Sequence, residues 1–494
     1  MMRTRSRRLA PLALAALVGG LLAVPSVAAE GPVSVTVWVT DPGTNTYLAQ
    51  QSSVPLTTGR SSAPVKITVT PTTTYQSVTG FGASFTDSSA WLIDQHLSPA
   101  KRADLMQKLF NPTTGIGMTL LRQPMSATDF NAPTSGTAGL YTYDDMPIGQ
   151  SDPGLTHFSI AHDEAYILPE LREALAVNPD LTIMATPWSP PGWMRANGQT
   201  LGMVGGSLKP EAYADWALYF VKFIQAYQAA GVPIDYMTPQ NEPLNELILL
   251  PSMRIGAPDE ALLIRNHLGP ALRAAGLSTK ILGYDFTWDN TYYPTALFAD
   301  PLASSYLAGT AWHCYGGNPG QMSPIHDLAP TKETFVTECS GLRSSPPEFV
   351  VTDASQLKKT MNLFIDSTRN WANGVILWNI ALDSFNGPSN GCVICRPLVS
   401  IDYNLFEGWG WHPAIEYYAM GQVAKFVRPG AVRVDSTTSA TGINNASFVN
   451  ADGSRVVVAV NNGSAVQTFA VQWGGQFFSY TLNAGATATF TLPA

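Results

Sequence analysis

The sequence predicts an α/β protein, a (β/α)8 TIM barrel with a β-sandwich side domain that both chain ends form. Three observations lead to this fold class: a length of 494 residues, eight apolar runs that alternate with helical stretches in the middle of the chain, and valine- and threonine-rich strands at both ends. The predicted boundaries are 1–29 for a signal peptide, 73–424 for the barrel, and 30–72 together with 425–494 for the side domain.

The first 29 residues have the pattern of a secretory signal peptide. Four arginines between Arg3 and Arg8 precede an apolar stretch from Leu9 to Val24, and Val27-Ala28-Ala29 supplies small residues before a cleavage site. A transmembrane anchor is the alternative, but the stretch is short for a span and is broken by glycines and a proline. We therefore expect a secreted, extracellular protein without stable membrane insertion.

Both ends of the mature chain alternate polar and apolar residues with period two, which indicates exposed β-strands. The segments are Val33–Val39, Val65–Val69, Ser454–Val460, Thr468–Trp473 and Ala486–Thr491, and Asn-Gly and Gly-Gly turns separate those in the tail. Neither end has enough strands for a stable sheet with two covered faces, so we predict that the two ends combine into one sandwich.

The middle of the chain repeats a different unit, in which a short apolar run is followed by a helical stretch. One such stretch is 213–230, where four aromatic residues fall at helical spacing: Trp216, Phe220, Phe223 and Tyr227. The eight runs end near Asp87, Ser126, Trp188, Glu242, Asp285, Tyr315, Glu338 and Asn379. A doubly wound sheet is the alternative, but it does not explain why polar and aromatic residues mark the end of every run. In a barrel those ends share one face, which holds the active site.

Composition and motifs exclude several functional classes. The net charge is −8 and no basic run follows the N-terminus, so nucleic acid is not an expected partner. There is no His-Glu-x-x-His motif, the seven histidines show no ligand spacing, and no glycine-rich phosphate loop follows a strand. We therefore predict no metal and no cofactor.

The chain has four cysteines. Cys392 and Cys395 lie in a loop flanked by glycine and proline, and a zinc ribbon would need a second such pair, so we predict a local disulfide. Cys314 and Cys339 stand singly in the sequence, and we expect them to be buried free thiols.

Two carboxylates indicate the chemistry. Glu242 ends the fourth apolar run and Glu338 ends the seventh, so a barrel would place them across its mouth. An isolated glutamate is usually a solvated surface residue. Both of these, however, end hydrophobic strands among polar or aromatic neighbours. Retaining glycosidases need two carboxyl groups about 5–5.5 Å apart, one as nucleophile and one as proton donor and acceptor.

Five motifs in the chain are similar to those of glycoside hydrolase family 30, which contains glucosylceramidases and β-1,6-glucanases. They are Gly80-Phe-Gly-Ala-Ser-Phe-Thr-Asp87, Leu121-Arg-Gln-Pro-Met-Ser126, Thr186-Pro-Trp-Ser-Pro-Pro-Gly-Trp193, Thr238-Pro-Gln-Asn-Glu-Pro243 and Trp378-Asn-Ile-Ala-Leu-Asp383. The resemblance covers roughly residues 75–430 and extends to the side domain. It implies that Glu242 is the acid/base and Glu338 the nucleophile.

The resemblance also implies substrate-binding residues. Arg122 would hydrogen-bond the nucleophile and favour its ionised form, Asn241 would contact the sugar 2-hydroxyl, and Asp129 would accept hydrogen bonds from other hydroxyls.

Four aromatic residues complete the expected site. Trp188 and Trp378 would form the walls of the −1 subsite, and His313 and Tyr315 would close the sixth strand beside the nucleophile. Taken alone, His313 would be assigned a structural role.

Two features depart from the glucosylceramidase pattern. Cys314 follows His313 where those enzymes carry tryptophan, and the loop 387–397 contains the pair Cys392 and Cys395. The resemblance places this loop beside the aglycone side of the cleft.

From the two carboxylates and the family resemblance we predict double-displacement hydrolysis of β-glucosidic bonds, with β-1,6-glucan as the leading substrate. Glucosylceramide, small β-glucosides and xylan are alternatives, and a catalytically inactive carbohydrate-binding protein is the alternative from another class.

Overall fold

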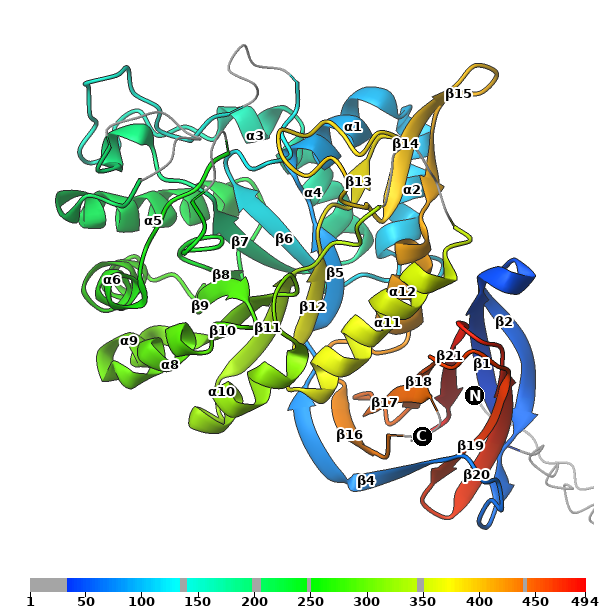
Figure 1. Cartoon of the computed structure of the whole chain (residues 1–494). Helices are drawn as coiled ribbons and strands as arrows, with labels where there is room; N and C mark the ends of the chain where they lie inside the picture. Colours follow the sequence, from blue (N-terminus) through cyan, green and yellow to red (C-terminus); the bar gives the residue numbers. More distant parts are fainter. Residues whose placement is uncertain (1–32, 134–139, 198–205, 247–249, 344–350, 439–441) are drawn as a thin grey trace, which may run out of the picture.

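The computed structural model describes residues 33–133, 140–197, 206–246, 250–343, 351–438 and 442–494. They form a closed barrel of parallel strands surrounded by helices, and a second body of antiparallel strands packed beside it (Figure 1). This confirms the predicted fold class. The predicted signal peptide, residues 1–29, lies outside the described residues.

The eight barrel strands coincide with the eight apolar runs, and they close in the order β10-β11-β12-β5-β6-β7-β8-β9. Their bounds are β5 Gly80–Ser84, β6 Leu120–Met125, β7 Thr182–Pro187, β8 Tyr236–Met237, β9 Lys280–Thr287, β10 Leu307–His313, β11 Glu333–Glu338 and β12 Gly374–Leu377. Residues of seven strands fill the interior as one buried cluster: Leu120, Met184, Tyr236, Leu282, Ala311, Phe335 and Ile376. The eighth strand, β5, has glycine at position 82, because a Cβ there would come within 1.5 Å of the Leu120 carbonyl oxygen.

Helices cover the outside of the barrel. Their bounds are α1 Asp87–His96, α2 Pro99–Phe110, α3 Ala161–Ala165, α4 Ile167–Val177, α5 Tyr213–Ala229, α6 Ala257–Leu263, α7 Gly269–Ala274, α8 Tyr292–Ala299, α9 Pro301–Tyr306, α10 Met322–Leu328, α11 Ala354–Arg369 and α12 Ile415–Ala424. A π-helical turn, Ile264–Leu268, joins α6 to α7. Helix α5 confirms the helix predicted over 213–230, and its four aromatic residues at helical spacing are buried against the barrel.

A three-stranded sheet, which the sequence pattern did not predict, follows β12. It consists of β13 Ala381–Leu382, β14 Val399–Asn404 and β15 Gly408–Pro413. Its hairpin β14–β15 projects away from the barrel (Figure 1). The loop between β13 and β14 carries Cys392 and Cys395.

Both chain ends build the second body, as predicted. Its ten strands form one sheet in the order β2-β1-β21-β18-β17-β16-β4-β19-β20-β3. The bounds are β1 Ser34–Asp41, β2 Thr46–Pro55, β3 Thr57–Thr58, β4 Lys66–Ser77, β16 Val432–Ser436, β17 Ile443–Val449, β18 Arg455–Asn461, β19 Gln467–Trp473, β20 Gln476–Leu482 and β21 Thr487–Leu492. Strand β1 pairs with β21, and β4 pairs with β16 and β19.

The expectation that these strands are exposed is wrong for one of their two faces. Val35, Val37 and Ile67 are fully buried, because the sheet curves around a core of its own that includes Phe469 and Phe490. The apolar residues of the period-two alternation are therefore the ones that enter this core.

Helix α12 joins the two bodies through its C-terminal half. The Gln422 side chain donates a hydrogen bond to Thr40 of β1 and accepts one from Thr489 of β21. Just after the helix, the Phe426 ring packs against Trp38. The barrel is thus attached to strands from both ends of the chain.

We expect a truncation after Ala424 to give insoluble protein. It removes β16–β21 and so exposes the buried faces of β1 and β4, whose partners lie in the deleted segment. Expression of the full and truncated chains side by side, with fractionation and size-exclusion chromatography, measures the effect. A soluble monomeric truncation that melts at the temperature of the intact protein would contradict this dependence.

The two disulfides differ in how far the sequence predicted them. Cys392 and Cys395 are bonded, as expected. The expectation of free thiols at Cys314 and Cys339 is wrong, because these residues form a second disulfide with their Cα atoms 5.2 Å apart. They follow β10 and β11, which are neighbours in the barrel, so strand pairing brings together residues separated by 25 positions.

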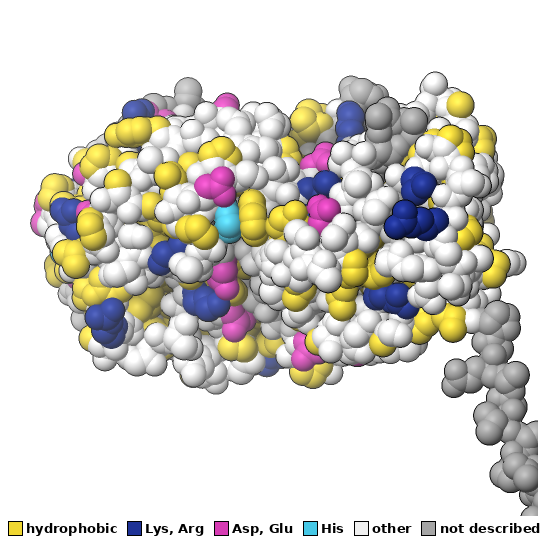
Figure 2. All heavy atoms as spheres, turned by 90° about the horizontal axis from the view of Figure 1, so that it is seen from below, with side chains coloured by type: hydrophobic (Ala, Val, Ile, Leu, Met, Phe, Trp, Pro, Cys, Tyr) yellow, Lys and Arg dark blue, Asp and Glu magenta, His cyan; other side chains and the backbone are white. Residues whose placement is uncertain are grey.

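No helix among the described residues is long and apolar enough to cross a membrane. On the face drawn in Figure 2, basic and acidic side chains are scattered among uncharged ones. The expectation that nucleic acid is not a partner stays a prediction.

Candidate active site

Glu242 and Glu338 meet at the carboxyl ends of the barrel strands. Glu338 is the last residue of β11, and Glu242 lies shortly after β8. A carboxylate oxygen of one lies within 4.8 Å of a carboxylate oxygen of the other. Glu242 has φ +46°, a left-handed conformation that is costly for a residue other than glycine and that is found at functional sites.

Arg122, in the middle of β6, is fully buried between two carboxylates. Its Nη1 donates a hydrogen bond of 2.6 Å to Glu338 Oε2, and its Nη2 lies 3.0 Å from Asp285 Oδ2. Such charge-assisted contacts fix the orientation of a carboxylate and favour its ionised form. The structure thus places Arg122 on the predicted nucleophile, as expected.

Asp285, near the end of β9, connects the two halves of the site. Besides Arg122, it is the partner of His313 Nε2 at 3.0 Å and accepts hydrogen bonds from Thr238 and Thr337. Asp285 is fully buried, but the surrounding charges of Arg122 and His313 outweigh the effect of burial and hold its pKa well below the usual range. Sequence reasoning placed Asp285 at a strand end and assigned it no role. Its position on the active-site face of the barrel was the available signal.

The backbone at Asp285 is held in an unusual conformation. Tyr284 and Asp285 have φ +81° and +73°, and the pairing of β9 with β10 shifts register here. The buried carboxylate of Glu260, on α6, accepts a hydrogen bond of 3.0 Å from the Tyr284 amide. Helix α6 therefore supports the bulge that turns Asp285 toward Arg122.

His313, the last residue of β10, bridges Asp285 and the predicted acid/base. Its Nδ1 lies 3.1 Å from Glu242 Oε1, and its Nε2 lies 3.0 Å from Asp285 Oδ1. Because both partners are carboxylates, both ring nitrogens can donate only if the ring is protonated. Burial lowers the pKa of His313, but the charges of Glu338 and Asp285 and the hydrogen bonds to Asp285 and Glu242 raise it to about 9.

The surroundings of Glu242 favour its ionised form. A negative charge on Glu338 alone would instead favour the neutral form. Burial does raise the pKa of Glu242, but hydrogen bonds from His313 and Asn245, with the charge of His313, outweigh it and lower the pKa. The Asn245 amide donates to Glu242 Oε2 at 2.7 Å. In this arrangement the proton lies on His313, next to Glu242. Asn245 was not predicted as a site residue.

Tyr315 and Asn241 complete the contacts around the two carboxylates. The Tyr315 hydroxyl donates to Glu338 Oε1 at 2.9 Å, so both nucleophile oxygens have partners. The Asn241 side-chain oxygen accepts a hydrogen bond of 2.8 Å from Arg122, which leaves its amide group for another partner. Both residues lie where the sequence placed them.

Trp188 and Trp378 form a stacked pair, with ring centroids 5.2 Å apart and planes 22° from parallel. The Arg122 guanidinium lies 4.8 Å from the centroid of the Trp188 ring and 5.5 Å from that of Trp378. Phe130, Leu382 and Cys395 pack around them. The pair thus supports Arg122 in addition to forming an apolar wall.

A small cavity of about 60 Å³ lies between these groups. Its lining comprises Asp129, Trp188, Asn241, Glu242, Asn245, Leu250, Pro251, Ser252 and Glu338. Leu250, Pro251 and Ser252 come from the loop after Glu242 and were not predicted. Trp378 stacks behind Trp188 and is absent from this lining.

Asp129 meets the loop that carries the local disulfide. Its backbone oxygen accepts a hydrogen bond of 2.7 Å from the Asn390 amide, and a Cβ on Gly391 would lie 2.6 Å from the Asp129 Cβ. Burial and the negative charge of Glu338 raise the pKa of Asp129 to about 8. A protonated carboxyl can donate one hydrogen bond to a hydroxyl as well as accept others.

Within the described residues, Glu242, His313 and Glu338 are a possible metal-ligating group, with candidate atoms within 4.8 Å of one another. These atoms already have partners: Arg122 and Tyr315 bind Glu338, while His313 lies between Glu242 and Asp285. The buried guanidinium also disfavours a second cation. The arrangement fits proton transfer and nucleophilic attack better than metal binding.

We expect the free energy of unfolding to fall as the pH rises from 6.5 to 9. The folded pKa of His313 is about 9, whereas an unfolded histidine has about 6.5. Its stabilising contribution is therefore complete below pH 6.5 and is lost as the pH rises through 9, by an amount on the order of 3 kcal/mol. Calorimetric melting between pH 6 and pH 9 measures this change.

Asp129 contributes with the same sign, because its raised pKa favours the folded protein at low pH. Asp129→Asn removes that contribution, and the pH dependence of stability that remains above pH 7 is expected to come from His313 and from Glu170, whose pKa burial raises to about 8. A melting temperature that is constant between pH 6.5 and 9 in both proteins would show that His313 is neutral in the folded state.

Comparisons with known proteins agree with this geometry. A model described as the glycosyl hydrolase family 30 TIM-barrel domain matches residues 78–426, and one described as the family 30 beta sandwich domain matches residues 430–490. An endo-1,6-β-D-glucanase of Neurospora crassa is 35% identical over 450 residues, which cover 87% of this chain and 88% of that protein. A putative glucosylceramidase 4 of Caenorhabditis elegans is 30% identical over 82% of this chain and 78% of its own length. The solved endo-β-1,6-glucanase BT3312 has a TM-score of 0.83 and 31% identity, covering 93% of this chain and 99% of its own.

Proposed function

Because this chain belongs to glycoside hydrolase family 30 and is therefore a glycosidase, we propose that it is a secreted, retaining enzyme that hydrolyses β-1,6-glucan. One observation carries the mechanism: carboxylate oxygens of Glu242 and Glu338 lie within 4.8 Å of each other. Retaining enzymes hold their two carboxyl groups about 5–5.5 Å apart, whereas inverting enzymes need roughly 6.5–9.5 Å to admit a water molecule.

In the first step, an oxygen of Glu338 attacks the anomeric carbon and the glycosidic bond breaks. The Glu338 carboxylate is held in place by Arg122 on one oxygen and Tyr315 on the other. The product of this step is a covalent glycosyl-enzyme ester, and the leaving oxygen must receive a proton.

The Glu242–His313 pair supplies that proton. Transfer from His313 Nδ1 to Glu242 along their 3.1 Å contact leaves a neutral ring whose Nε2 still donates to Asp285. Glu242 then passes its proton to the leaving oxygen. In the second step the Glu242 carboxylate accepts a proton from the water that attacks the glycosyl ester, which frees Glu338.

The groups that line the cavity are of the kinds that bind a sugar ring. Asn241 presents its amide, Asp129 presents a carboxyl, and Trp188 offers an aromatic face for the apolar face of a pyranose. The choice of β-1,6-glucan is supported by relatives named endo-1,6-β-glucanases, at 30% to 35% identity. Glucosylceramide is the second candidate, because a putative glucosylceramidase is 30% identical. Intact catalytic contacts argue against an inactive binding protein.

Secretion is supported by the leader-like pattern of residues 1–29 and by the two disulfides, since disulfides persist in oxidising compartments. Expression in a bacterial host with an export pathway, followed by N-terminal analysis of the protein in the medium, tests this part. Cleavage after Ala29 is expected. Retention of the intact leader inside the cell would contradict it.

The substrate is tested by incubating the protein with β-1,6-glucan, β-1,3-glucan, xylan and glucosylceramide under identical conditions, with product analysis over time. We expect β-1,6-glucan to be degraded fastest. Faster release of glucose from glucosylceramide would favour the second candidate. No release from any β-glycoside would overturn the proposal.

The stereochemical outcome tests the mechanism independently of the substrate. Two inversions at one carbon give net retention, so hydrolysis should first release the β-anomer. Proton NMR of the anomeric region in the first minutes of reaction measures this before mutarotation mixes the anomers. Initial release of the α-anomer would exclude double displacement and the nucleophile role of Glu338.

A further inference from the structure

The Cys314–Cys339 disulfide lies beside the residues that would perform the reaction. Cys339 directly follows Glu338, and Cys314 lies between His313 and Tyr315. His313 contacts Glu242, while Tyr315 donates to Glu338. One covalent bond therefore joins the segment that carries the nucleophile to the segment that carries two of its neighbours.

The backbone pairing of these segments is irregular at this point. Strands β10 and β11 pair in regular register up to Trp312 and Val336, and a register shift then sets His313 opposite Glu338. Beyond it, the Cys314 amide donates a long hydrogen bond of 3.3 Å to the Glu338 carbonyl. The disulfide thus links the two strands where their hydrogen-bond ladder becomes irregular, next to the reacting carboxylate.

The same bond also borders the aromatic wall. The Cys339 carbonyl accepts a hydrogen bond of 2.8 Å from the Trp378 amide, and Trp378 stacks on Trp188. A displacement of Cys339 would therefore be transmitted both to Glu338 and to the residue that supports Trp188.

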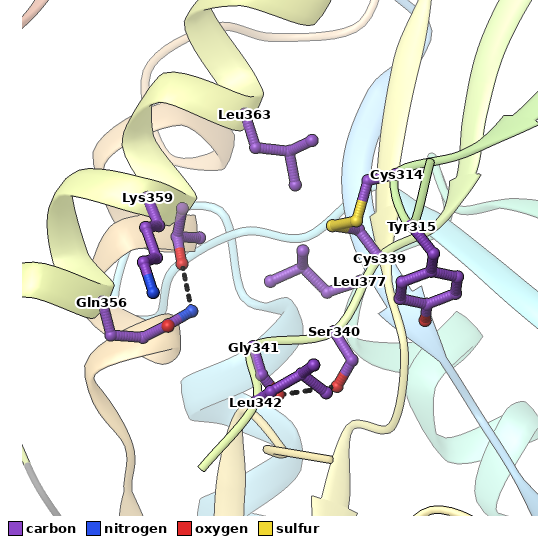
Figure 3. Close-up of a pocket in the computed structure, with 11 residues that line it drawn as sticks. Cys314, Tyr315, Cys339, Ser340, Gly341, Leu342, Gln356, Lys359, Leu363 and Leu377 are labelled. Atoms are coloured by element: carbon purple, nitrogen blue, oxygen red, sulfur yellow. Dashed lines mark hydrogen bonds between the residues drawn. A yellow bond between two sulfur atoms is a disulfide. The ribbon is translucent and has the colours of Figure 1, made fainter. Parts of the chain in front are cut away.

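A small molecule can approach this disulfide from a pocket that is separate from the sugar cavity. The pocket has a volume of about 380 Å³ and is lined by both cysteines, by Leu363 of α11 and by Leu377 of β12. Figure 3 shows the sulfur–sulfur bond beside Tyr315, across the pocket from Gln356 and Lys359. Cys314 is only half-buried, so the bond is not enclosed by the barrel core.

We propose that Cys314–Cys339 is a redox modification site that positions Glu338, His313 and Tyr315, and that its reduction by a small dithiol slows catalysis without unfolding the barrel. This inference rests on the proposed function of Glu338. In the reaction, a dithiol thiolate attacks one sulfur and forms a mixed disulfide, and its second thiol closes the ring. The dithiol is oxidised to a cyclic disulfide, and the two cysteines gain two electrons and two protons.

Reduction should impair nucleophilic attack as well as proton donation, because Cys339 follows Glu338 and Cys314 follows His313, the partner of Glu242. A misplaced Glu338 slows attack whatever the leaving group, and a displacement of about 1 Å can cost on the order of 100-fold in rate. We therefore expect kcat/KM to fall 10- to 100-fold for both an aryl β-glucoside with a good leaving group and one with a poor leaving group. A purely structural weakening would lower the melting temperature but leave kcat/KM at 25 °C unchanged.

The experiment treats the folded, oxidised enzyme with dithiothreitol and follows thiol content by mass spectrometry, secondary structure by circular dichroism, and kcat/KM on both glucosides. Cys314→Ser/Cys339→Ser should have the activity of the reduced enzyme and should not respond further to the dithiol. Cys392→Ser/Cys395→Ser is the matched control variant. On reduction, its kcat/KM should decrease by the same factor as that of the wild type. Reoxidation of the wild type should restore its activity.

Complete reduction of Cys314 and Cys339 with unchanged kcat/KM would overturn the proposal, as would a loss that disappears in Cys392→Ser/Cys395→Ser. If the double serine variant at 314 and 339 fails to fold, reduction of the folded wild type still gives the answer. An oxidised enzyme without activity on any β-glycoside would instead contradict the proposed function, so the two failures are distinguishable.

Discussion

Replacement of Glu338 by glycine is expected to lower kcat by about 10⁴-fold or more, because no covalent glycosyl-enzyme can form. Arg122 would remain paired with Asp285, so the buried guanidinium keeps one carboxylate and the fold is expected to survive. Added azide should occupy the space of the missing carboxylate, attack the anomeric carbon of an activated aryl β-glucoside and give the α-glycosyl azide. The measurement is the rate of phenol release with and without azide, with NMR of the product.

Glu333→Gln is the matched control for this prediction. Glu333 begins the same strand, β11, at the end remote from the site, where it pairs with Lys280 and accepts a hydrogen bond from Tyr236. We expect it to retain activity close to that of the wild type. If Glu338→Gly were as active as Glu333→Gln without azide, Glu338 could not be the nucleophile.

Replacement of Glu242 by glutamine should separate substrates by their leaving groups. An amide cannot donate an acidic proton, so kcat/KM is expected to fall about 10²- to 10⁴-fold for β-1,6-glucan and alkyl glucosides. For a dinitrophenyl glucoside, whose leaving group needs no proton, kcat/KM should fall far less. The second step still lacks its base, so a burst of phenol release should precede slow turnover.

The product formed with azide distinguishes a replacement of Glu242 from the replacement of Glu338. In Glu242→Ala the glycosyl ester on Glu338 still forms, and azide attacks it from the opposite side, so the product should be the β-glycosyl azide. Glu246→Gln, four residues along the chain and partly exposed, is the control and should behave as the wild type does. Equal losses for both classes of leaving group in Glu242→Gln would remove Glu242 from the role of proton donor.

The barrel could be predicted from the sequence because each of its strands has a local signal. Every strand is an apolar run with a polar or aromatic end, and the barrel geometry places these ends on one face. The sheet β13–β15 had no such signal. Strand β13 spans only Ala381–Leu382, and β15 contains two glycines, which are depleted in strands. Its conformation depends on packing after β12, which local pattern cannot show.

The residues of the candidate site likewise include some with a local sequence signal and some without one. Glu242, Arg122 and Asn241 lie in sequence motifs and Glu338 ends an apolar run, so their neighbourhood could be expected before the structure. Asp285 could not be singled out, because its importance comes from four partners in or just after other strands and from a left-handed backbone that Glu260 supports from α6.

Two further features could not be predicted from local sequence: the disulfide between Cys314 and Cys339, and the proton on His313. The disulfide depends on which strands are adjacent, and the protonation depends on two carboxylates that face one ring. Sequence spacing records neither of these relations.

The pairing of β1 with β21 has a consequence for biosynthesis. Thr36 lies opposite Thr491, so the first strand of the side domain has to wait for almost the last residues of the chain. At a synthesis rate of about 5–20 residues per second, a ribosome needs roughly 25–100 s to deliver that partner. During this interval the valine-rich β1 and the long β4 have unpaired edges, which are the segments most prone to aggregate. The early strands of this protein are therefore expected clients of a holding chaperone, and the side domain can fold only after β21 has been synthesised.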